Sequence, residues 1–324
     1  MMRLSILMFV SFLFLVSCDN KDVPTVSHLE SKVNVSHFDH SFFAMDSTKL
    51  GESLGELEKD FPNFFESDQN KGDLVSRFKD SQIRELFYAS DSVFPNPSVL
   101  SIEITNAFKY FHYYFPQHDS LNIYTWISNF ESIEPITVSG NTLLVALDLY
   151  LGQNAHFYTS APEYIKEGFD KRYLVSDLVH AYFLANIPMP SENTLLASMV
   201  YYGKIHYLCS LLIPQSSSDI VMKYSETKMD WCIDNEATIW AYFIENKLLF
   251  SSQHQIKQRF IENAPFSKFY TNFDAESPGR IAQWIGWKLV SSYMDAHPEL
   301  SLNELINEQN AQKILRKSHY KPKQ

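Results

Sequence analysis

The chain has 324 residues and a formal net charge of −11. This acidic balance argues against nonspecific binding to nucleic acids, which requires a basic surface. Aromatic residues make up 15% of the chain, with 25 Phe and 18 Tyr, and this content suits a large hydrophobic core. We expect one large domain.

The start of the chain has the layout of a secretory signal. Arg3 supplies a positive head, and an apolar run follows over residues 4–16. This run is shorter than the roughly 20 apolar residues that cross a bilayer, and Leu15-Val16-Ser17-Cys18 has the form of the lipobox of bacterial lipoproteins. We therefore predict a lipoprotein signal peptide over residues 1–17, cleavage before Cys18 and lipid attachment to its thiol. A plain secretory signal with an incidental cysteine is the alternative.

The residues that follow the cleavage site are polar and contain few apolar side chains. They are expected to form a lipidated N-terminus and tether over residues 18–28, and residues 29–324 are expected to form a single domain. Two or three acyl chains hold a protein stably on a membrane, whereas a single chain binds only marginally. We expect a cell-envelope protein anchored by lipid on the periplasmic side of the inner or the outer membrane.

The first part of the domain combines a weak strand signal with helical periodicity. Val33 and Val35 alternate with polar residues, which favours a first strand that extends toward Phe43. Asn96 and Pro97 mark a helix start, because Asn is a good N-cap and Pro suits the first helical position. Apolar residues at helical spacing predict helices over residues 50–65, 74–87 and 97–115, and Pro116 stops the last of them.

The pattern changes to strands in the middle of the chain. Residues 121–127 alternate and are rich in residues that favour strands. Residues 135–138 and 142–148 flank Ser139-Gly140-Asn141, which is a turn signal. The sequence therefore predicts an antiparallel meander of two or three strands.

Helical periodicity returns in the second half. Helices are predicted over residues 173–185 and 194–212, and each ends before a proline. Ser225 is expected to cap one long helix whose apolar face continues to Leu248, and Ser277-Pro278 to cap another that places Trp284 in the core. The predicted fold is α+β, mostly helical with a small central antiparallel sheet.

Several common enzyme motifs are absent from the sequence. The nine glycines form no GxG pair, which excludes the dinucleotide-binding fingerprint and the kinase-type glycine loop. There is no P-loop and no GxSxG motif, and no His is followed by Glu, which excludes the HExxH zinc helix. We therefore predict that the protein is not an enzyme, with no catalytic residue, no cofactor, no metal site and no small-molecule substrate.

Two sets of histidines could suggest a metal site. His37 and His40 lie beside Asp39, but in a strand His37 and Asp39 would face one way and His40 the other. His112 and His118 lie on either side of a proline, so helical spacing does not bring them together. Neither set is expected to bind metal.

Four other features have a structural interpretation and a functional alternative. Cys209 and Cys232 lie in apolar, helix-like surroundings, so burial without a bond is favoured over a disulfide. Glu236 lies beside Trp240 on an apolar helix face and is expected to be paired rather than catalytic. The basic tail, Lys313–Lys323, is expected to be a solvated end, and attraction to anionic headgroups is the alternative.

The sequence resembles the GldB family of gliding-motility lipoproteins of Bacteroidota. The resemblance extends from the lipobox to the tail and is carried by short segments, namely residues 199–205, 231–232, 235–244, 264–269, 276–280, 284–287 and 317–323. It implies a cell-envelope lipoprotein needed for gliding, in a group where the gliding machinery is coupled to the type IX secretion system. It implies partners among the gliding and secretion proteins and no established enzymatic activity.

The middle of the chain also resembles zincin-type metallopeptidases in degenerate form. In that resemblance His180 matches the first zinc ligand, Ala181 replaces the catalytic Glu, and Leu184 replaces the second His. Tyr202 stands where the Glu ligand would be. One ligand cannot hold catalytic zinc, which needs three protein ligands, and a general base is missing.

These observations favour a non-catalytic, membrane-anchored component of the gliding apparatus that acts through protein contacts. One alternative is an envelope peptidase or hydrolase of zincin-like fold with an unrecognised site. The other is a module that binds peptide or glycan in a cleft near His180.

Overall fold

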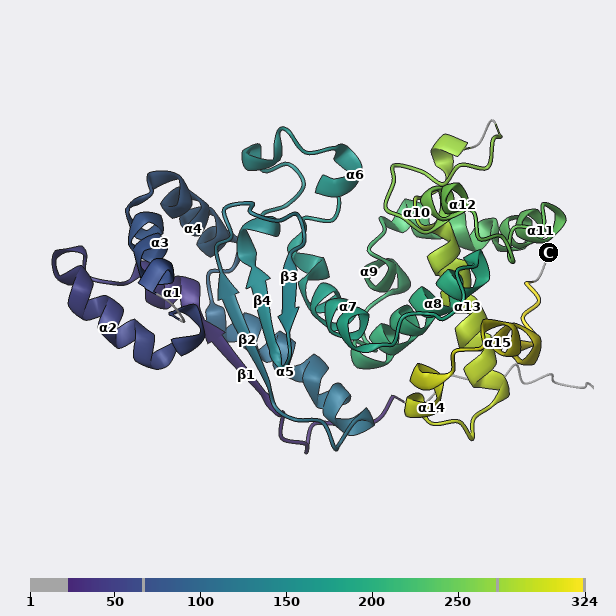
Figure 1. Cartoon of the computed structure of the whole chain (residues 1–324), viewed down its shortest axis with the longest axis horizontal. Helices are drawn as coiled ribbons and strands as arrows, with labels where there is room; N and C mark the ends of the chain where they lie inside the picture. Colours follow the sequence, from purple (N-terminus) through teal and green to yellow (C-terminus); the bar gives the residue numbers. More distant parts are fainter. Residues whose placement is uncertain (1–22, 66–67, 272–273, 323–324) are drawn as a thin grey trace, which may run out of the picture.

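The computed structural model describes residues 23–65, 68–271 and 274–322 (Figure 1). The predicted signal peptide, the lipid-attachment residue Cys18 and the first part of the predicted tether lie outside the described residues, as does Lys323 in the tail. Among the residues that are described, no helix combines the length and apolar character needed to span a membrane.

A four-stranded sheet lies in the middle of the molecule. It consists of β1 (Val33–His37), β2 (Leu121–Trp126), β3 (Ile136–Ser139) and β4 (Thr142–Ala146), in the order β1-β2-β4-β3. β1 and β4 both run parallel to β2, and only the β3–β4 hairpin is antiparallel. The predicted hairpin around Ser139-Gly140-Asn141 is confirmed, but the antiparallel pairing predicted for residues 121–127 is wrong, so the sheet is mixed. Parallel pairs need long crossover connections, which a pattern of neighbouring strands does not reveal.

The N-terminal helices connect β1 to β2. They are α1 (Phe38–Phe43), α2 (Leu50–Asp60), α3 (Asp68–Lys79), α4 (Ser81–Val93) and α5 (Pro97–Tyr114). The helix start at Asn96 is confirmed, because its side chain accepts a hydrogen bond from the Ser98 amide. The helix predicted over 74–87 is divided between α3 and α4 at Asp80, whose carboxylate accepts from the amides of Gln82 and Ile83 and so starts a new helix.

The strand predicted to extend toward Phe43 ends at His37, and residues 38–43 are helical. The apolar residues Phe38 and Phe42 are four positions apart, and their side chains are buried together. This spacing is that of one helix face rather than of one strand face.

The second half of the chain is helical, as predicted. Short helix α6 (Glu163–Lys166) precedes α7 (Leu174–Asn186), α8 (Leu195–Leu212), α9 (Ser218–Met222), α10 (Glu226–Asp234), α11 (Glu236–Glu245), α12 (His254–Phe260), α13 (Ile281–Ala296), α14 (Leu302–Asn307) and α15 (Ala311–Ser318). The predicted long helix from Ser225 to Leu248 is wrong in one respect. It breaks at Asn235, whose side-chain amide donates to the Trp231 carbonyl and separates α10 from α11.

The α+β fold class is confirmed. In Figure 1 the helices α1–α4 lie on one side of the sheet, and α7, next to β3, leads to the C-terminal helices on the other side. The predicted burial of Trp284 is confirmed at 1% exposure, although α13 begins at Ile281 rather than at Ser277-Pro278. Arg280 precedes the helix in a left-handed conformation, which sets the later start.

Helices α8 and α13 cross at two glycines. A Cβ atom on Gly203 would lie 2.2 Å from the Gly286 carbonyl oxygen, and one on Gly286 would lie 1.9 Å from the Met199 carbonyl oxygen. The backbones therefore approach too closely for any side chain at these positions. This crossing fixes where α8 presents Tyr202 and His206 relative to the start of α13.

Candidate functional site

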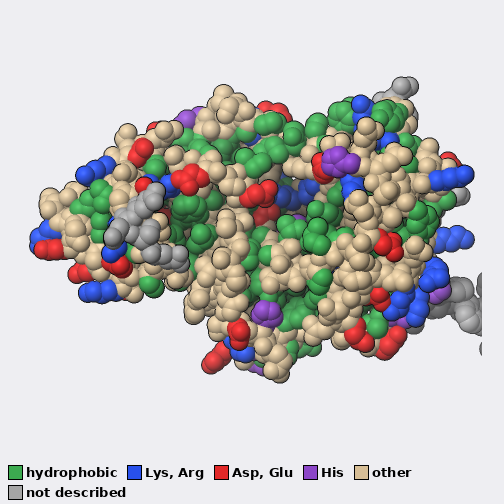
Figure 2. All heavy atoms as spheres, viewed as in Figure 1, with side chains coloured by type: hydrophobic (Ala, Val, Ile, Leu, Met, Phe, Trp, Pro, Cys, Tyr) green, Lys and Arg blue, Asp and Glu red, His purple; other side chains and the backbone are tan. Residues whose placement is uncertain are grey.

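A cavity of about 660 Å³ lies between the sheet and the C-terminal helices. Figure 2 shows the corresponding surface as a hollow with cationic and anionic side chains at its base. The walls come from β3, α7, α8, α9 and the segments that precede α13. The lining includes Ile133, Ile136, Val138, Glu167, Asp177, His180, Leu184, Tyr202, His206, Lys223, Lys228, Glu262, Ala264, Gly279, Arg280 and Gln283.

Two imidazole rings meet at the base of this cavity. His180 on α7 and His206 on α8 have ring centroids 5.2 Å apart. Nε2 of His206 lies 3.0 Å from Oε1 of Gln283, and Nε2 of Gln283 donates to the Ile261 carbonyl. Because the amide oxygen of Gln283 is thus the acceptor, His206 carries its proton on Nε2. Nε2 of His180 is shielded from solvent and has no hydrogen-bond partner.

Both histidines are neutral at physiological pH. The pKa of His180 is lowered to about 3, mainly by burial and in addition by the positive charges of Arg280 and Lys223. Burial also lowers the pKa of His206 to about 3, and the neighbouring His180 contributes. The site therefore offers imidazoles as neutral hydrogen-bonding groups in a positive electrostatic field.

The cations of the cavity differ in how their charges are balanced. Nζ of Lys223 donates to Oδ2 of Asp177 at 2.6 Å, and Lys228 forms an ion pair with Glu167. Arg280 instead donates from Nη2 to the carbonyls of Met222 and Lys223, at 3.1 Å each, and lies over the ring of Tyr224. No ion pair to Arg280 occurs among the described residues, and its Nε has no hydrogen-bond partner.

Two cationic residues of the cavity, Lys223 and Arg280, share an unusual backbone conformation. Lys223 has φ 55° and Arg280 has φ 61°, both in the left-handed region that non-glycine residues rarely adopt. Gly279, directly before Arg280, lies so close to residue 264 that a Cβ atom on it would be 2.1 Å from the Ala264 carbonyl oxygen. This close approach fixes the backbone that leads into Arg280. Left-handed residues of this kind carry a local energetic cost and often mark functional sites.

Comparison with protein-family models found a match to gliding motility protein GldB over residues 19–322. The chain belongs to the GldB family. This membership associates it with gliding motility and with the cell envelope. Comparisons with curated proteins and with solved structures found no match.

The segments that carry the GldB resemblance meet at the cavity and at the crossing of α8 with α13. Tyr202, Ala264 and Arg280 line the cavity, and Gly203 and Gly286 form the helix crossing. Segments far apart in the sequence are therefore neighbours in the fold.

The positions compared with zincin peptidases lie on two helices. His180, Ala181 and Leu184 are on α7, and all three line the cavity, with Leu184 42% exposed. The ring of His206, four residues after Tyr202 on α8, lies beside His180. No solved structure supports the zincin likeness, which stays a prediction. Within the described residues, no group of three or more His, Cys, Asp and Glu side chains could hold a metal ion.

The first histidine set lies at the junction of β1 and α1. Nδ1 of His37 lies 3.0 Å from Oγ1 of Thr125, which donates to Oδ1 of buried Asp39 at 2.5 Å. The predicted strand alternation is wrong here because Asp39 is in a helix. His40 lies 3.5 Å from Asp91, so its nearest carboxylate partner is on α4.

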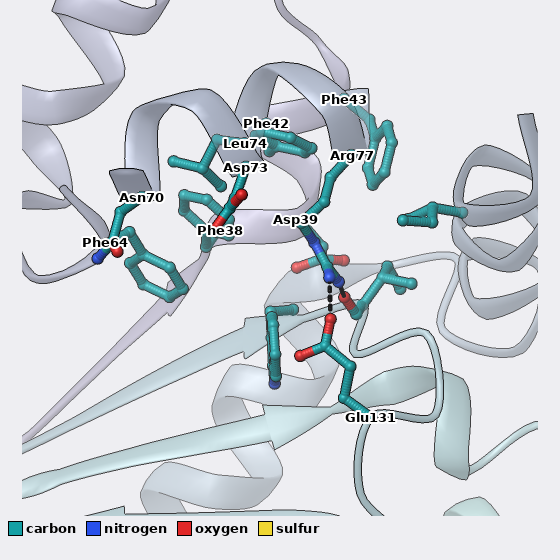
Figure 3. A pocket seen from close by; sticks show the side chains of 13 residues that line it. Phe38, Asp39, Phe42, Phe43, Phe64, Asn70, Asp73, Leu74, Arg77 and Glu131 are labelled. Atoms are coloured by element: carbon teal, nitrogen blue, oxygen red, sulfur yellow. Dashed lines mark hydrogen bonds and ion pairs between the residues drawn. The ribbon is translucent and has the colours of Figure 1, made fainter. Parts of the chain in front are cut away.

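Asp39 also lines a smaller cavity of about 330 Å³, shown in Figure 3. The carboxylate of Glu131 points toward Arg77 there and forms an ion pair with it. Arg77 also donates to the Ile127 carbonyl at 2.6 Å and lies 5.3 Å from the Trp126 ring centroid. Arg77 and Glu131 of this smaller cavity are therefore paired with each other.

The two residues of the second histidine set, His112 and His118, line one small cavity of about 10 Å³, but among the described residues they join no group of three ligands that could hold a metal. His118 contacts the Tyr182 hydroxyl at 2.6 Å through Nε2, while His112 lies on α5. Cys209 and Cys232 are buried and free, which confirms the prediction of burial without a bond. Glu236 is paired, as predicted, because it accepts a hydrogen bond from the Tyr320 hydroxyl at 2.7 Å.

The basic tail is only partly a solvated end. Residues 311–318 form α15, and its Ile314 is fully buried. Lys204, itself 3% exposed, donates to the carbonyls of Ile306 and Glu308 just before this helix. The expectation of a solvated end is therefore wrong for α15, which packs against α13 and α8.

Sequence reasoning identified His180 and Tyr202 but missed His206, Lys223 and Arg280. His206 had a usable signal, because it lies one helical turn after Tyr202 and so on the same face. Arg280 lies in the segment 276–280 that carries part of the GldB resemblance, but the sequence did not mark it or Lys223 as a site residue. Their left-handed conformations and their contact come from the packing of distant segments.

Proposed function

We propose that this protein is a membrane-anchored cell-envelope lipoprotein that acts in gliding motility through contacts with the gliding and type IX secretion machinery, without catalysis. The observation that carries the proposal is the GldB family match over residues 19–322, which begins directly after the lipobox cysteine. The lipobox supplies the anchor and the large folded domain supplies the surface for partners.

The residues of α7 support the proposal that the protein acts without catalysis. Ala181 and Leu184 occupy the positions where a zinc-peptidase helix would carry its general base and its second ligand. Neither side chain can move a proton or donate a lone pair to a metal. His180 is partly buried, His206 is buried, and both are neutral. The carboxylate of α7, Asp177, is bound to Lys223 and to the Tyr150 hydroxyl.

The anchor is tested by Cys18→Ser in the full chain. We expect loss of lipidation, release from the membrane fraction and loss of gliding, because serine lacks the thiol that carries the acyl group. Fractionation, metabolic labelling with a fatty acid and a motility assay measure these outcomes. Cys232→Ser is the matched control, because it makes the same chemical change at a cysteine within the domain. Retention of the Cys18→Ser protein on the membrane would disprove the anchor.

The contact function is tested by crosslinking in gliding cells, followed by capture of the full-length protein. We expect gliding or secretion proteins to be captured with the wild type, and the same proteins to be lost or reduced with Cys18→Ser. Capture of none of these proteins would contradict the proposal. Metal analysis separates it from the peptidase alternative, because a near-stoichiometric zinc content lost in His180→Ala would indicate a metalloenzyme.

A second candidate function is a peptide- or glycan-binding module. The observation that favours it is that the His180 region lines a cavity of about 660 Å³ rather than a closed core. Cavities of this size, apolar with a few polar groups, are typical of ligand sites.

A further inference from the structure

We propose that the cavity around His180 binds an extended peptide segment that carries a carboxylate, with the carboxylate at Arg280 and the adjoining apolar side chains against Ile133 and Leu184. This inference rests on the proposed function, in which the protein acts by binding. It goes further by assigning a site and a chemical class of partner.

The first argument is the uncompensated charge of Arg280. Its guanidinium lines the cavity and donates to two backbone carbonyls, and among the described residues Nε has no partner. Arg280 is partly buried, and a cation that lacks a counter-ion and has a shielded N–H group without a partner is costly. A carboxylate removes both costs, because it accepts two parallel hydrogen bonds from a guanidinium.

The second argument is that the other charges near the base are already balanced. Lys223 is paired with Asp177, and Lys228 is paired with Glu167. The remaining acids of the lining, Glu134 and Glu262, are exposed at the rim. Solvent screens those rim charges much more than a shielded pair at the base. Arg280 is therefore the cation of the base whose charge is not balanced by a carboxylate of the described residues, and it favours an anionic ligand.

The third argument concerns His180. Its Nε2 is shielded and has no partner within the part of the chain that the structure describes. The ring remains neutral, so it can hydrogen-bond to a ligand without adding charge. A carboxylate that reached Arg280 would enter the same positive field that lowers the pKa of His180.

The fourth argument favours a peptide over a small free anion. β3 is an edge strand, paired only with β4, and its residues Ile136 and Val138 line the cavity. Helix α7 packs beside β3. Where α7 leaves the edge uncovered, its unpaired backbone groups can bind an extended peptide as a further strand. Ile133 and Leu184 are 64% and 42% exposed on the same lining, which suits the apolar side chains of such a segment.

The test uses the purified full-length lipoprotein in detergent and a synthetic library of random hexapeptides, prepared with either free or amidated C-termini. We expect wild-type protein to enrich peptides that have a carboxylate next to apolar residues. Enrichment only in the free-terminus library identifies a terminal carboxylate, and enrichment in both libraries identifies Asp or Glu. Either result supports the proposal.

Leu184→Glu places a negative charge on the rim of the cavity. We expect it to weaken binding of the enriched peptides at least about tenfold, a change that is readily measured. Ile244→Glu is the matched control, because Ile244 is also helical, is 49% exposed and does not line the cavity. Arg280→Gln is expected to remove the preference for a carboxylate, provided that its melting curve matches the wild type.

Three results would overturn the proposal. They are no enrichment over a protein-free control, enrichment of peptides rich in Lys or Arg, and equal weakening by Leu184→Glu and Ile244→Glu. Binding of acidic oligosaccharides without any peptide would also overturn it, in favour of a glycan site. A failed selection leaves the Cys18→Ser and crosslinking results unchanged, so failure of this inference is distinguishable from failure of the proposed function.

Discussion

His206 and His180 show how single residues are made neutral by their surroundings. His206 is 1% exposed and pairs with Gln283, its ring centroid lies 5.2 Å from that of His180, and the charge of Arg280 acts on both rings. An unfolded imidazole titrates near pH 6.5, whereas the pKa values of both histidines in the folded protein are about 3. Between these values the unfolded chain binds more protons than the folded one.

The free energy of unfolding should therefore fall as the pH falls from about 6.5 toward 3. Each neutral histidine lowers it by up to about 1.4 kcal/mol per pH unit in this range. We expect His206→Gln to lose less stability than the wild type between pH 7 and pH 5, by up to about 2 kcal/mol. Urea denaturation at both pH values measures the difference.

His156→Gln is the control for this experiment, because His156 has a side chain that is 75% exposed. Its loss of stability between the two pH values should equal that of the wild type. Equal pH dependence of His206→Gln and the wild type would show that burial does not hold His206 neutral.

At the residue scale, the sequence predicted what depends on local pattern. Trp284 was placed in the core by helical spacing, and the two cysteines were correctly assigned as buried and free. The environment of Arg280 could not be predicted, because its left-handed conformation and its neighbours Met222 and Tyr224 come from packing between distant segments. Whether a charged side chain has a counter-ion depends on the folded structure and cannot be predicted from the spacing of residues in the sequence.

At the element scale, the crossing of α8 and α13 depends on two glycines. Gly286→Ala would place a methyl carbon 1.9 Å from the Met199 carbonyl oxygen. The helices would have to separate, which disturbs the buried Trp284 and Ile285 beside the crossing. We expect the free energy of unfolding to fall by about 1–3 kcal/mol or more, or the protein to fail to fold. Thermal or urea denaturation measures this change.

Gly55→Ala is the matched control for this substitution. Gly55 lies inside α2, and a Cβ there meets nothing within 4 Å. Alanine should stabilise this helix by up to about 1 kcal/mol, because glycine is a poor helix former. A Gly286→Ala protein as stable as the wild type would mean that the two helices cross at a greater distance.

Element starts were predictable where a side chain caps the backbone. Asn96 and Thr194 both accept hydrogen bonds from the first turn of their helices, as their sequences indicate. Breaks within apolar runs, at Asp80 and Asn235, were missed because the periodicity continues across them. Sheet order was missed for another reason, since the pairing of β1 with β2 joins segments separated by five helices.

At the scale of the whole molecule, α8 connects the two main parts of the hydrophobic core. Its residues Ile205 and Leu208 pack with the sheet, α5 and α7. Its residues Met199 and Val200 pack with α13 and the other C-terminal helices. Because one helix belongs to both parts, unfolding of either part removes support from the other.

We therefore expect residues 29–324 to unfold in a single cooperative transition, as the prediction of one domain requires. The five tryptophans allow a direct measurement. In one variant Trp126 is kept and the other four tryptophans are replaced by Phe, so its fluorescence reports on the sheet. In a second variant only Trp284 is kept, so its fluorescence reports on α13. Both fluorescence curves should coincide with far-UV circular dichroism in urea, provided that each variant retains the wild-type spectrum. Two transitions separated in urea concentration would instead divide the chain into two domains that unfold independently, with the boundary at α8.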